Sequence, residues 1–321
     1  MKLKLAYLFL LPLLFFGCRS GEQQTASYHS PQFKADGQDF FIKGMNWKYY
    51  PIGTNYDYYL WEQSDSFIKK ALKDEMSMLK EIGVNTIRQY TDIPPKWITY
   101  IYKEYGIYTV LNHSFGRYGL TLNGKWVTPT NYADSATQDL ILSEIQDLVN
   151  SYNNTPGVLM YLLGNENNYG LFWEGAETED IPEETEEGVT RANALFKLFN
   201  KGVEIIKRTD KKTPVAICNG DLKYIDLLVK ECPTVDVLGI NIYRGLSFGS
   251  FFKDLKAVSD KPVMLTEFGA DALNNVTKSE DQEAQANYIK SNWKEIYDNA
   301  PGFDKAANCI GGFTFQFTDG W

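Results

Sequence analysis

The distribution of apolar residues is the feature that most constrains how this chain can fold. Eight short runs rich in β-forming residues recur along the 321 residues, at 40–47, 85–90, 107–114, 158–167, 214–220, 235–243, 262–269 and 309–317. Most of them are almost continuously hydrophobic, which is typical of strands that are covered on both faces. A strand with one face in water would instead alternate apolar and polar residues. The runs therefore predict a buried and mainly parallel sheet.

Amphipathic helical patterns separate these runs. Apolar residues return every three or four positions at 67–83, 134–152, 185–209 and 281–299. Asp134 and Ser135 supply a start signal ahead of the second of these patterns. Eight strand-and-helix units in roughly 280 residues match the size of a (β/α)8 barrel, whereas a doubly wound open sheet more often has five to seven strands. We therefore expect the α/β class and a (β/α)8 TIM barrel, formed as one domain by residues 33–321.

Both ends of the expected barrel have distinctive features. The Asp36-Gly37 turn within residues 32–41 predicts an N-terminal β-hairpin that closes the barrel floor. The chain stops at Trp321, directly after the eighth predicted strand. We therefore expect the closing helix to be absent from this chain, either because the chain is truncated or because the natural protein continues.

Residues 1–17 have the pattern of an export signal. Two lysines precede an apolar stretch that is too short, and too closely followed by polar residues, for a membrane span. The Phe-Phe-Gly-Cys sequence that ends at Cys18 resembles a bacterial lipoprotein cleavage box. This resemblance implies lipidation of Cys18, a flexible tether over residues 18–32, and a protein held on a bacterial membrane through that lipid, in the periplasm or at the cell surface. The alternative is an ordinary secretory signal with an incidental cysteine.

Composition excludes several classes of partner. The net charge of −9, without a basic stripe, argues against a nucleic-acid partner. Three further cysteines, an odd number without a Cys-x-x-Cys spacing, indicate neither a zinc site nor a disulfide framework. Only two histidines are present, which excludes a histidine-rich metal centre. We expect no cofactor and no metal, and the sequence does not indicate the oligomeric state.

Two glutamates follow strongly apolar runs where the expected strands end. In a barrel of this kind the active site lies at the carboxyl ends of the strands, so Glu166 and Glu267 are the candidate catalytic groups. Burying even a neutral polar group without a partner costs roughly 2–7 kcal/mol, so each glutamate needs a function or a partner. A purely structural pairing, such as Glu267 with Arg88, is the alternative. Two carboxylates among amides and aromatic residues suit cleavage of a glycosidic bond, with a carbohydrate as substrate.

Several motifs together resemble a known family. DGQDFFIKGMNW, IGVNTIRQY, GNEN, DVLGINIYRG and TEFG are similar to segments of the catalytic domain of family-2 glycosidases, within the clan A superfamily of retaining (β/α)8 glycosidases. FFIKG, NTIRQY and the seventh-strand motif also resemble β-1,3-glucanosyltransferases. The likeness runs from about residue 33 to the end. It implies that Glu166 is the general acid and base, that Glu267 is the nucleophile, and that Asn165 binds the sugar 2-hydroxyl.

The resemblance also implies roles for residues around the two glutamates. Arg88 and Tyr243 would hold the nucleophile ionised, and Trp321 would form the floor of the subsite at the cleaved bond. Trp47, at the end of the first strand, is a further candidate for substrate binding. His113 ends the third strand and is predicted to contact substrate or to act in acid–base chemistry, and its alternative is a hydrogen-bonded structural histidine.

Two loops and two rival functions stay open at this stage. The acidic segment 173–188 could bind calcium, but a solvated loop leading into a helix is favoured, and Trp173 within it either walls the cleft or anchors the loop. Aromatic residues crowd positions 49–61, where they could stack on sugars or only pack the loop. A transglycosylase would share all of these residues. A non-catalytic glycan-binding lipoprotein is the other rival.

Overall fold

The computed structural model describes residues 33–55, 57–90, 93–173, 184–303 and 305–318. Eight parallel strands of this part of the chain form the barrel: β3 (Ile42–Asn46), β4 (Thr86–Gln89), β5 (Tyr108–His113), β8 (Val158–Leu163), β9 (Val215–Gly220), β10 (Val237–Asn241), β11 (Val263–Phe268) and β14 (Cys309–Thr314). They pair in the closed order β10-β11-β14-β3-β4-β5-β8-β9. Each strand lies inside one of the eight apolar runs, so the predicted barrel is confirmed.

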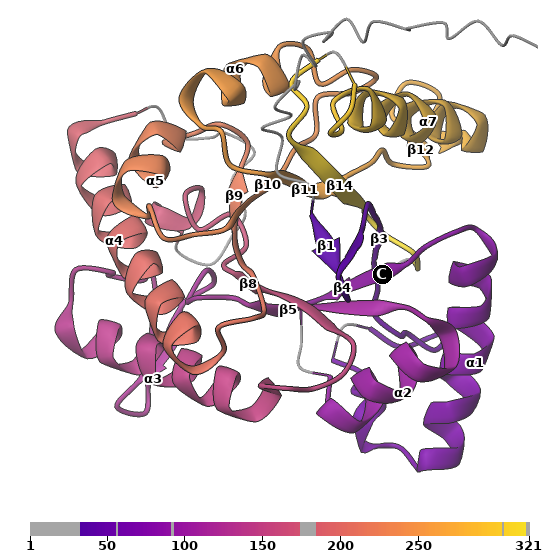
Figure 1. The fold of residues 1–321 in the computed structure, drawn as a ribbon, viewed down its shortest axis with the longest axis horizontal. Coiled ribbons are helices and arrows are strands. Elements are labelled where there is room, and N and C mark those ends of the chain that lie inside the picture. The colour runs from indigo at the N-terminus through magenta and orange to yellow at the C-terminus, as the bar shows by residue number, and fades with distance from the viewer. Residues whose placement is uncertain (1–32, 56, 91–92, 174–183, 304, 319–321) are drawn as a thin grey trace, which may run out of the picture.

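Seven α-helices among the described residues surround the strands, as Figure 1 shows. They are α1 (Asp65–Glu81), α2 (Pro95–Tyr105), α3 (Ser135–Tyr152), α4 (Glu186–Thr209), α5 (Ile225–Glu231), α6 (Phe251–Val258) and α7 (Gln282–Asp298). The four longest match the four predicted patterns. The predicted start signal is correct, because the Asp134 carboxylate caps α3 by accepting a hydrogen bond from the Thr137 backbone N–H. Within the described residues no helix follows β14.

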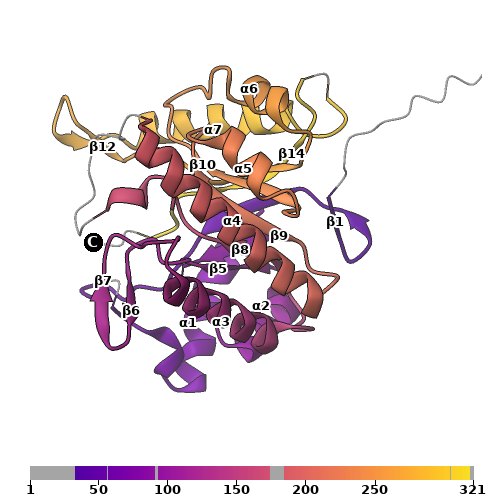
Figure 2. The ribbon, with the colours of Figure 1, turned by 90° about the vertical axis from the view of Figure 1, so that its left-hand side faces the viewer.

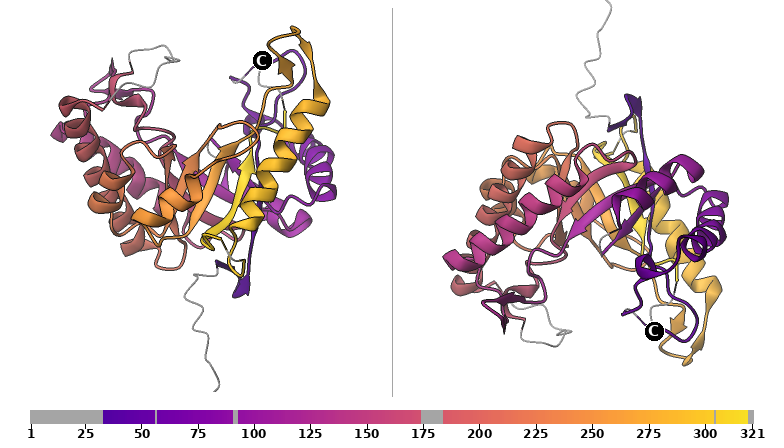
Figure 3. Two further views of the ribbon diagram at one scale, coloured as in Figure 1. Left: turned by 90° about the horizontal axis from the view of Figure 1, so that it is seen from above. Right: turned by 90° about the horizontal axis from the view of Figure 1, so that it is seen from below.

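Three short hairpins and two 3-10 helices complete the described structure. The hairpins are β1 (Lys34–Ala35) with β2 (Gln38–Asp39), β6 (Leu120–Leu122) with β7 (Lys125–Val127), and β12 (Leu273–Asn274) with β13 (Ser279–Glu280); the 3-10 helices are η1 (Leu60–Glu62) and η2 (Gly170–Phe172). Figure 2 shows the β6–β7 and β12–β13 hairpins at one end of the barrel and the β1–β2 hairpin at the other. Both views of Figure 3 show the same separation, with the indigo β1–β2 hairpin far from the golden β12–β13 hairpin.

Two apolar layers hold the barrel together. A large outer layer lies between strands and helices, and a smaller one fills the barrel interior with Ile42, Val110, Met160, Leu162, Ala216, Met264 and Phe313. The Phe313 ring occupies the space beside Gly44, where a Cβ atom would lie 2.3 Å from the ring. The β1–β2 hairpin is present as predicted, and its Ala35 packs against the interior layer together with Phe33 and Phe40. Burial of both strand faces explains why the runs are continuously apolar.

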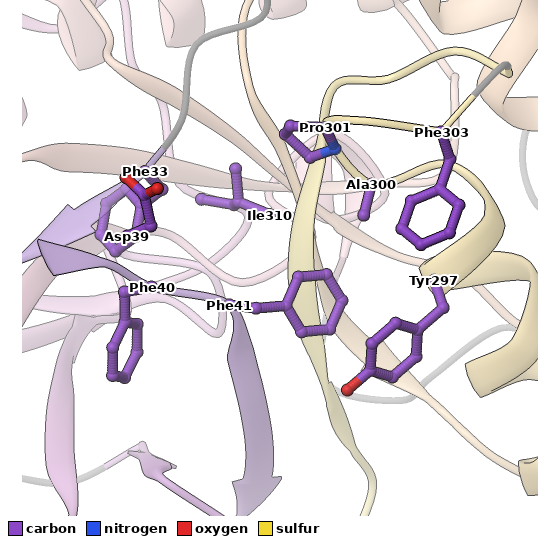
Figure 4. Close-up of a pocket in the computed structure, with 9 residues that line it drawn as sticks. All are labelled: Phe33, Asp39, Phe40, Phe41, Tyr297, Ala300, Pro301, Phe303 and Ile310. Carbon is purple, nitrogen blue, oxygen red and sulfur yellow. The ribbon is translucent and has the colours of Figure 1, made fainter. Parts of the chain in front are cut away.

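A separate aromatic pocket lies at the amino ends of the strands. It has a volume of about 260 Å³ and, as Figure 4 shows, is lined by Phe33, Asp39, Phe40, Phe41, Tyr297, Ala300, Pro301, Phe303 and Ile310. Asp39 is the one carboxylate among these residues, so the pocket lacks a pair of acidic groups. None of the helices in the described ranges is long and apolar enough to cross a membrane.

Candidate active site

The turn after β8 holds Glu166 in an unusual backbone conformation. Gly164 and Glu166 both have a positive φ, of 82° and 56°. The side chain of Asn167 stabilises this turn, because its Oδ1 accepts the backbone N–H of Asn165 at 2.8 Å and its Nδ2 donates to the Phe115 carbonyl at 3.0 Å. A non-glycine residue with positive φ carries strain that the surrounding contacts must compensate. The polar Gly-Asn-Glu-Asn segment thus forms a rigid turn that positions one carboxylate.

The Glu166 side chain is half-buried, and the Glu267 carboxylate is near enough to affect its charge. Glu166 Oε1 accepts one hydrogen bond from Asn241 Nδ2 at 3.1 Å. Burial is the main reason that the pKa of Glu166 is raised to about 7, and the negative charge of Glu267 raises it further. Arg117 and Arg88 act in the opposite direction. A carboxyl group with this pKa is protonated in a substantial fraction of molecules near neutral pH, as a general acid must be.

The Glu267 carboxylate, at the end of β11, is held by three donors. Arg88 Nη1 lies 3.0 Å from Oε1, the Tyr90 hydroxyl also donates to Oε1, and the Tyr243 hydroxyl donates to Oε2 at 2.9 Å. The Glu267 side chain is 10% exposed, and that of Arg88 is fully buried. Donors thus bind both oxygens of this carboxylate. The structure therefore brings Arg88 and Tyr243 to the predicted nucleophile.

Arg88 also connects the two glutamates. Its Nε and Nη2 donate to Asn112 Oδ1 at 2.9 and 2.7 Å, and Nη2 donates to Asn165 Oδ1 at 2.8 Å. Asn165 Oδ1 in turn accepts a hydrogen bond from Asn241, the residue that binds Glu166. One buried guanidinium thus fixes polar side chains that come from strands on opposite sides of the barrel.

Tyr90 is a residue of this cluster to which the sequence analysis assigned no role. It follows β4, two positions after Arg88, and residues two apart on an extended segment face the same side. Its hydroxyl contacts Glu267 and also lies 3.1 Å from Asn46 Oδ1. The alternation from Arg88 to Tyr90 in NTIRQY is the signal that could have revealed it. Asn241 is a strand-end residue whose contact with Glu166 was likewise not predicted.

Trp47 does not join the cluster. It follows Asn46, which faces the barrel interior, so its own side chain faces the helices. Its indole N–H donates to Glu75 Oε2 on α1 at 2.6 Å, and its ring packs beside that of Trp61, 6.3 Å away. Trp47 is only 1% exposed. This placement corrects the expectation that Trp47 binds substrate, since the residue instead joins the barrel to α1.

His113 is also directed away from the two glutamates. Its neighbour Asn112 points into the barrel and binds Arg88, whereas His113 Nε2 lies 3.3 Å from Glu144 on α3. His113 Nδ1 accepts the backbone N–H of Phe115 at 3.1 Å. These contacts correct the expectation of a substrate or acid–base role and favour the alternative, a hydrogen-bonded structural histidine.

The remaining predicted features fall partly outside the described residues. Trp321 and Cys18 lie outside them, as does most of the acidic segment 173–188. The end of that segment leads into α4, whose first turn contains two glutamates. Trp173 packs edge-on against Tyr118, with ring centres 5.6 Å apart. Trp61, from the aromatic segment 49–61, stacks on Trp97 of α2 and serves packing.

The described residues contain no group of three His, Cys, Asp or Glu that could hold a metal ion.

Comparison with known proteins decides the family. The model of the TIM-barrel domain of glycosyl hydrolases family 2 matches residues 62–301. The chain belongs to this family. A probable 1,3-beta-glucanosyltransferase of Saccharomyces cerevisiae is 31% identical over 230 residues, which cover 68% of this chain and 39% of the relative. The chain therefore spans well under half the length of this relative.

Solved structures share the fold at lower identity. Beta-glucuronidase 2 of Bacteroides uniformis superimposes with a TM-score of 0.60 at 15% identity, over 88% of this chain and 31% of the other. A beta-D-glucuronidase of Dictyoglomus thermophilum gives a TM-score of 0.56 at 21% identity, over 90% of this chain and 46% of the other. Both superpositions bear on the barrel fold, and the chain again covers less than half of each protein.

Proposed function

We propose that this family-2 barrel is a glycoside hydrolase that cleaves β-glycosidic bonds of an oligosaccharide or polysaccharide with retention of configuration. The observation that carries the proposal is the contrast between the two glutamates. Glu166 has one amide donor and a pKa raised by burial to about 7, whereas three donors bind Glu267. One carboxyl group is thus suited to give a proton and the other to attack as a carboxylate.

The mechanism follows from these environments. Glu267 attacks the anomeric carbon while Glu166 protonates the departing oxygen, and a covalent glycosyl–enzyme intermediate forms. Glu166, now ionised, then takes a proton from water, which displaces the Glu267 carboxylate from the sugar. Arg88 keeps both Asn165 and Glu267 in position during these steps. We further propose that Asn165 contacts the sugar 2-hydroxyl. Trp321 would form the floor of the subsite at which the bond is cleaved.

A transglycosylase is the second candidate. The 31% identity to a probable 1,3-beta-glucanosyltransferase favours it. The first half of the reaction is the same, and in the second half a sugar hydroxyl replaces water as the acceptor. Analysis of the products formed from defined β-linked oligosaccharides separates the two activities, because transfer yields chains longer than the substrate.

Covalent trapping tests the proposal directly. A panel of 2,4-dinitrophenyl 2-deoxy-2-fluoroglycosides is incubated with the protein, and intact mass is measured. We expect one adduct with at least one sugar, located on Glu267 by peptide mapping and lost in Glu267→Gln. A Glu144→Gln variant, which changes an exposed carboxylate on α3, should still form the adduct. Absence of an adduct with every sugar would favour a non-catalytic glycan binder.

We also propose that the protein is exported and anchored through a lipid on Cys18. The proposal depends on the sequence of residues 1–18, which precede the described part of the chain. Metabolic labelling with an alkyne fatty acid in a bacterial host tests it, with Cys18→Ser as the variant that should lose the label.

A further inference from the structure

The Asn241 side chain, at the end of β10, connects the proposed acid to two buried groups behind it. Its Nδ2 donates to Glu166 Oε1 and to Asn165 Oδ1, each at 3.1 Å. Its Oδ1 accepts hydrogen bonds from the Thr266 hydroxyl at 2.7 Å and from the Cys218 thiol at 3.1 Å. The nitrogen and the oxygen of this amide therefore face different sets of partners.

Strand geometry places the Thr266 side chain beside the amide oxygen. The register of β10 and β11 shifts just before Asn241, which lies opposite Glu267, so Thr266 falls between two paired positions. A Cβ atom at Gly239 would lie 2.9 Å from the Thr266 methyl group, so this glycine leaves room for the threonine. Thr266 and Cys218 are both buried, as is Asn241. Protein donors rather than solvent thus bind the amide oxygen.

Hydrogen-bond partners on both sides favour one orientation of the Asn241 amide. An asparagine amide is nearly symmetric in shape, so only its partners distinguish the oxygen from the nitrogen. Arg88 Nη2 donates to Asn165 Oδ1, which therefore presents an acceptor to Asn241. A flipped amide would place its oxygen against this acceptor and against the Glu166 carboxylate. The Thr266 hydroxyl opposes the same flip from the other side, because it donates to the amide oxygen.

The orientation of Asn241 matters most when Glu166 is ionised. Burial and the charge of Glu267 raise the pKa of Glu166, and the hydrogen bond from Asn241 lowers it. A donor binds a carboxylate more strongly than it binds a neutral carboxyl group. In the proposed reaction Glu166 loses its proton in the first step and takes one from water in the second. Between these steps its charge is stabilised by the N–H of Asn241.

We propose that the Thr266 hydroxyl, assisted by the Cys218 thiol, holds the Asn241 amide with its N–H groups toward Glu166 and so governs the proton exchange of Glu166. Thr266 acts through Asn241 and is therefore a positioning residue. This inference rests on the proposed function of Glu166. Other titratable or charged groups also act on the Glu166 carboxyl, and replacement of the Thr266 hydroxyl leaves them in place; they are Glu267, Arg88, Arg117, Tyr169 and Tyr243.

Titration of the Glu166 carboxyl by carbon-13 NMR tests the proposal without a substrate. The protein is labelled at the carboxyl carbon of glutamate, and the Glu166 signal is identified by its absence in Glu166→Gln. Thr266→Val removes the hydroxyl at nearly constant shape. It should move the titration midpoint of Glu166 upward by about 0.5–1 pH unit, because part of the stabilisation of the carboxylate by Asn241 is lost. Thr266→Ser keeps a hydroxyl and should titrate like the wild type.

A second variant tests the other donor to the amide oxygen. Cys218→Ala should move the midpoint in the same direction but less far, because a thiol is a weaker donor than a hydroxyl. If Thr266→Val does not fold, Cys218→Ala decides the matter, and a midpoint that does not rise would then overturn the proposal. Circular dichroism verifies that each variant is folded.

Two controls distinguish positioning from a general disturbance of the barrel. Thr109 on β5 is 1% exposed, and its hydroxyl has no hydrogen-bond partner among the described residues. Thr109→Val therefore makes the same chemical change at a buried strand position and should leave the midpoint unchanged. In an Asn241→Leu background, which removes the amide, Thr266→Val should have no further effect on the midpoint.

The outcomes separate this inference from the proposed function. An unchanged or lowered midpoint in Thr266→Val, an equal shift in Thr109→Val, or a full shift in the Asn241→Leu background would overturn the positioning role. Covalent trapping of Glu267 in the wild-type protein is an independent measurement. If Glu267 is trapped and Thr266→Val titrates like the wild type, only the positioning role fails. If the midpoint moves as expected but no adduct forms, the proposed reaction fails and Thr266 still orients Asn241.

Discussion

Replacement of Glu166 by glutamine should stabilise the protein at alkaline pH. The folded state raises the pKa of Glu166 from 4.5 to about 7, so the folded protein holds this proton more tightly than the unfolded chain does. When folding raises the pKa of a carboxyl group, the free energy of unfolding decreases as pH increases from the pKa of the unfolded chain to that of the folded protein, here from about 4.5 to about 7. Below this interval both states are protonated and the cost vanishes.

The size of the effect follows from the same pKa. The ionisation of Glu166 above pH 7 costs the folded state about 3 kcal/mol, and this is an upper bound because the side chain retains some contact with solvent. Glutamine is neutral at all pH values, and its carbonyl oxygen can still accept the hydrogen bond from Asn241. We therefore expect Glu166→Gln to exceed the wild type by about 2–3 kcal/mol at pH 8, and by about 1 kcal/mol or less at pH 5.

Urea denaturation of both proteins at pH 5 and pH 8 measures this difference. Subtraction at each pH cancels titration of groups that the substitution does not affect. Glu104→Gln, at an exposed position on α2, serves as the control and should show no pH-dependent gain. Glu166→Gln could instead gain the same stability at both pH values, or lose stability at pH 8. Either result would refute the view that the folded protein destabilises the ionised form of Glu166.

Three further predictions concern the same cluster. The value of kcat/KM should decline above about pH 7, as a pH–rate profile will show, because Glu166 must start protonated. Tyr90→Phe should lower kcat/KM about tenfold to a hundredfold without unfolding the protein, because a hydrogen bond to a charged group contributes roughly 1.5–3 kcal/mol; equal activity would contradict it. Arg88→Met should cost about 3–5 kcal/mol in urea unfolding, because it leaves the buried Glu267 without its cation, and a smaller loss would count against the network.

The barrel could be predicted from the sequence because each strand is buried on both faces. Continuous apolar runs such as 158–163 leave few alternatives, and long helices such as α4 repeat their apolar pattern over many turns. The shorter helices α5 and α6, with seven and eight residues, give only about two turns of periodicity. Such segments offer too little pattern to be separated from loops.

The candidate site was predicted in part, and the limit is the direction of the strand-end side chains. Asn46 and Trp47 are adjacent, as are Asn112 and His113, and alternation allows only one of each pair to face the interior. The sequence marks where a strand ends but not which of two neighbours points inward. The asparagines point inward in both pairs, where they meet Arg88, and the larger rings contact α1 and α3. Glu166 and Glu267 could be identified without knowledge of their side-chain directions, because a carboxylate at the end of a buried strand needs a partner or a function in either direction.

The β1–β2 hairpin has a consequence for how large substrates reach this protein. The chain enters the barrel at Phe33, beneath the interior layer and at the end opposite the strand ends that carry Glu166 and Glu267. A support attached to the chain before Phe33 is therefore connected to the barrel at the amino ends of its strands. The strand ends of the proposed site then lie on the side of the barrel away from the point of attachment, where substrate can reach them without passing the tether.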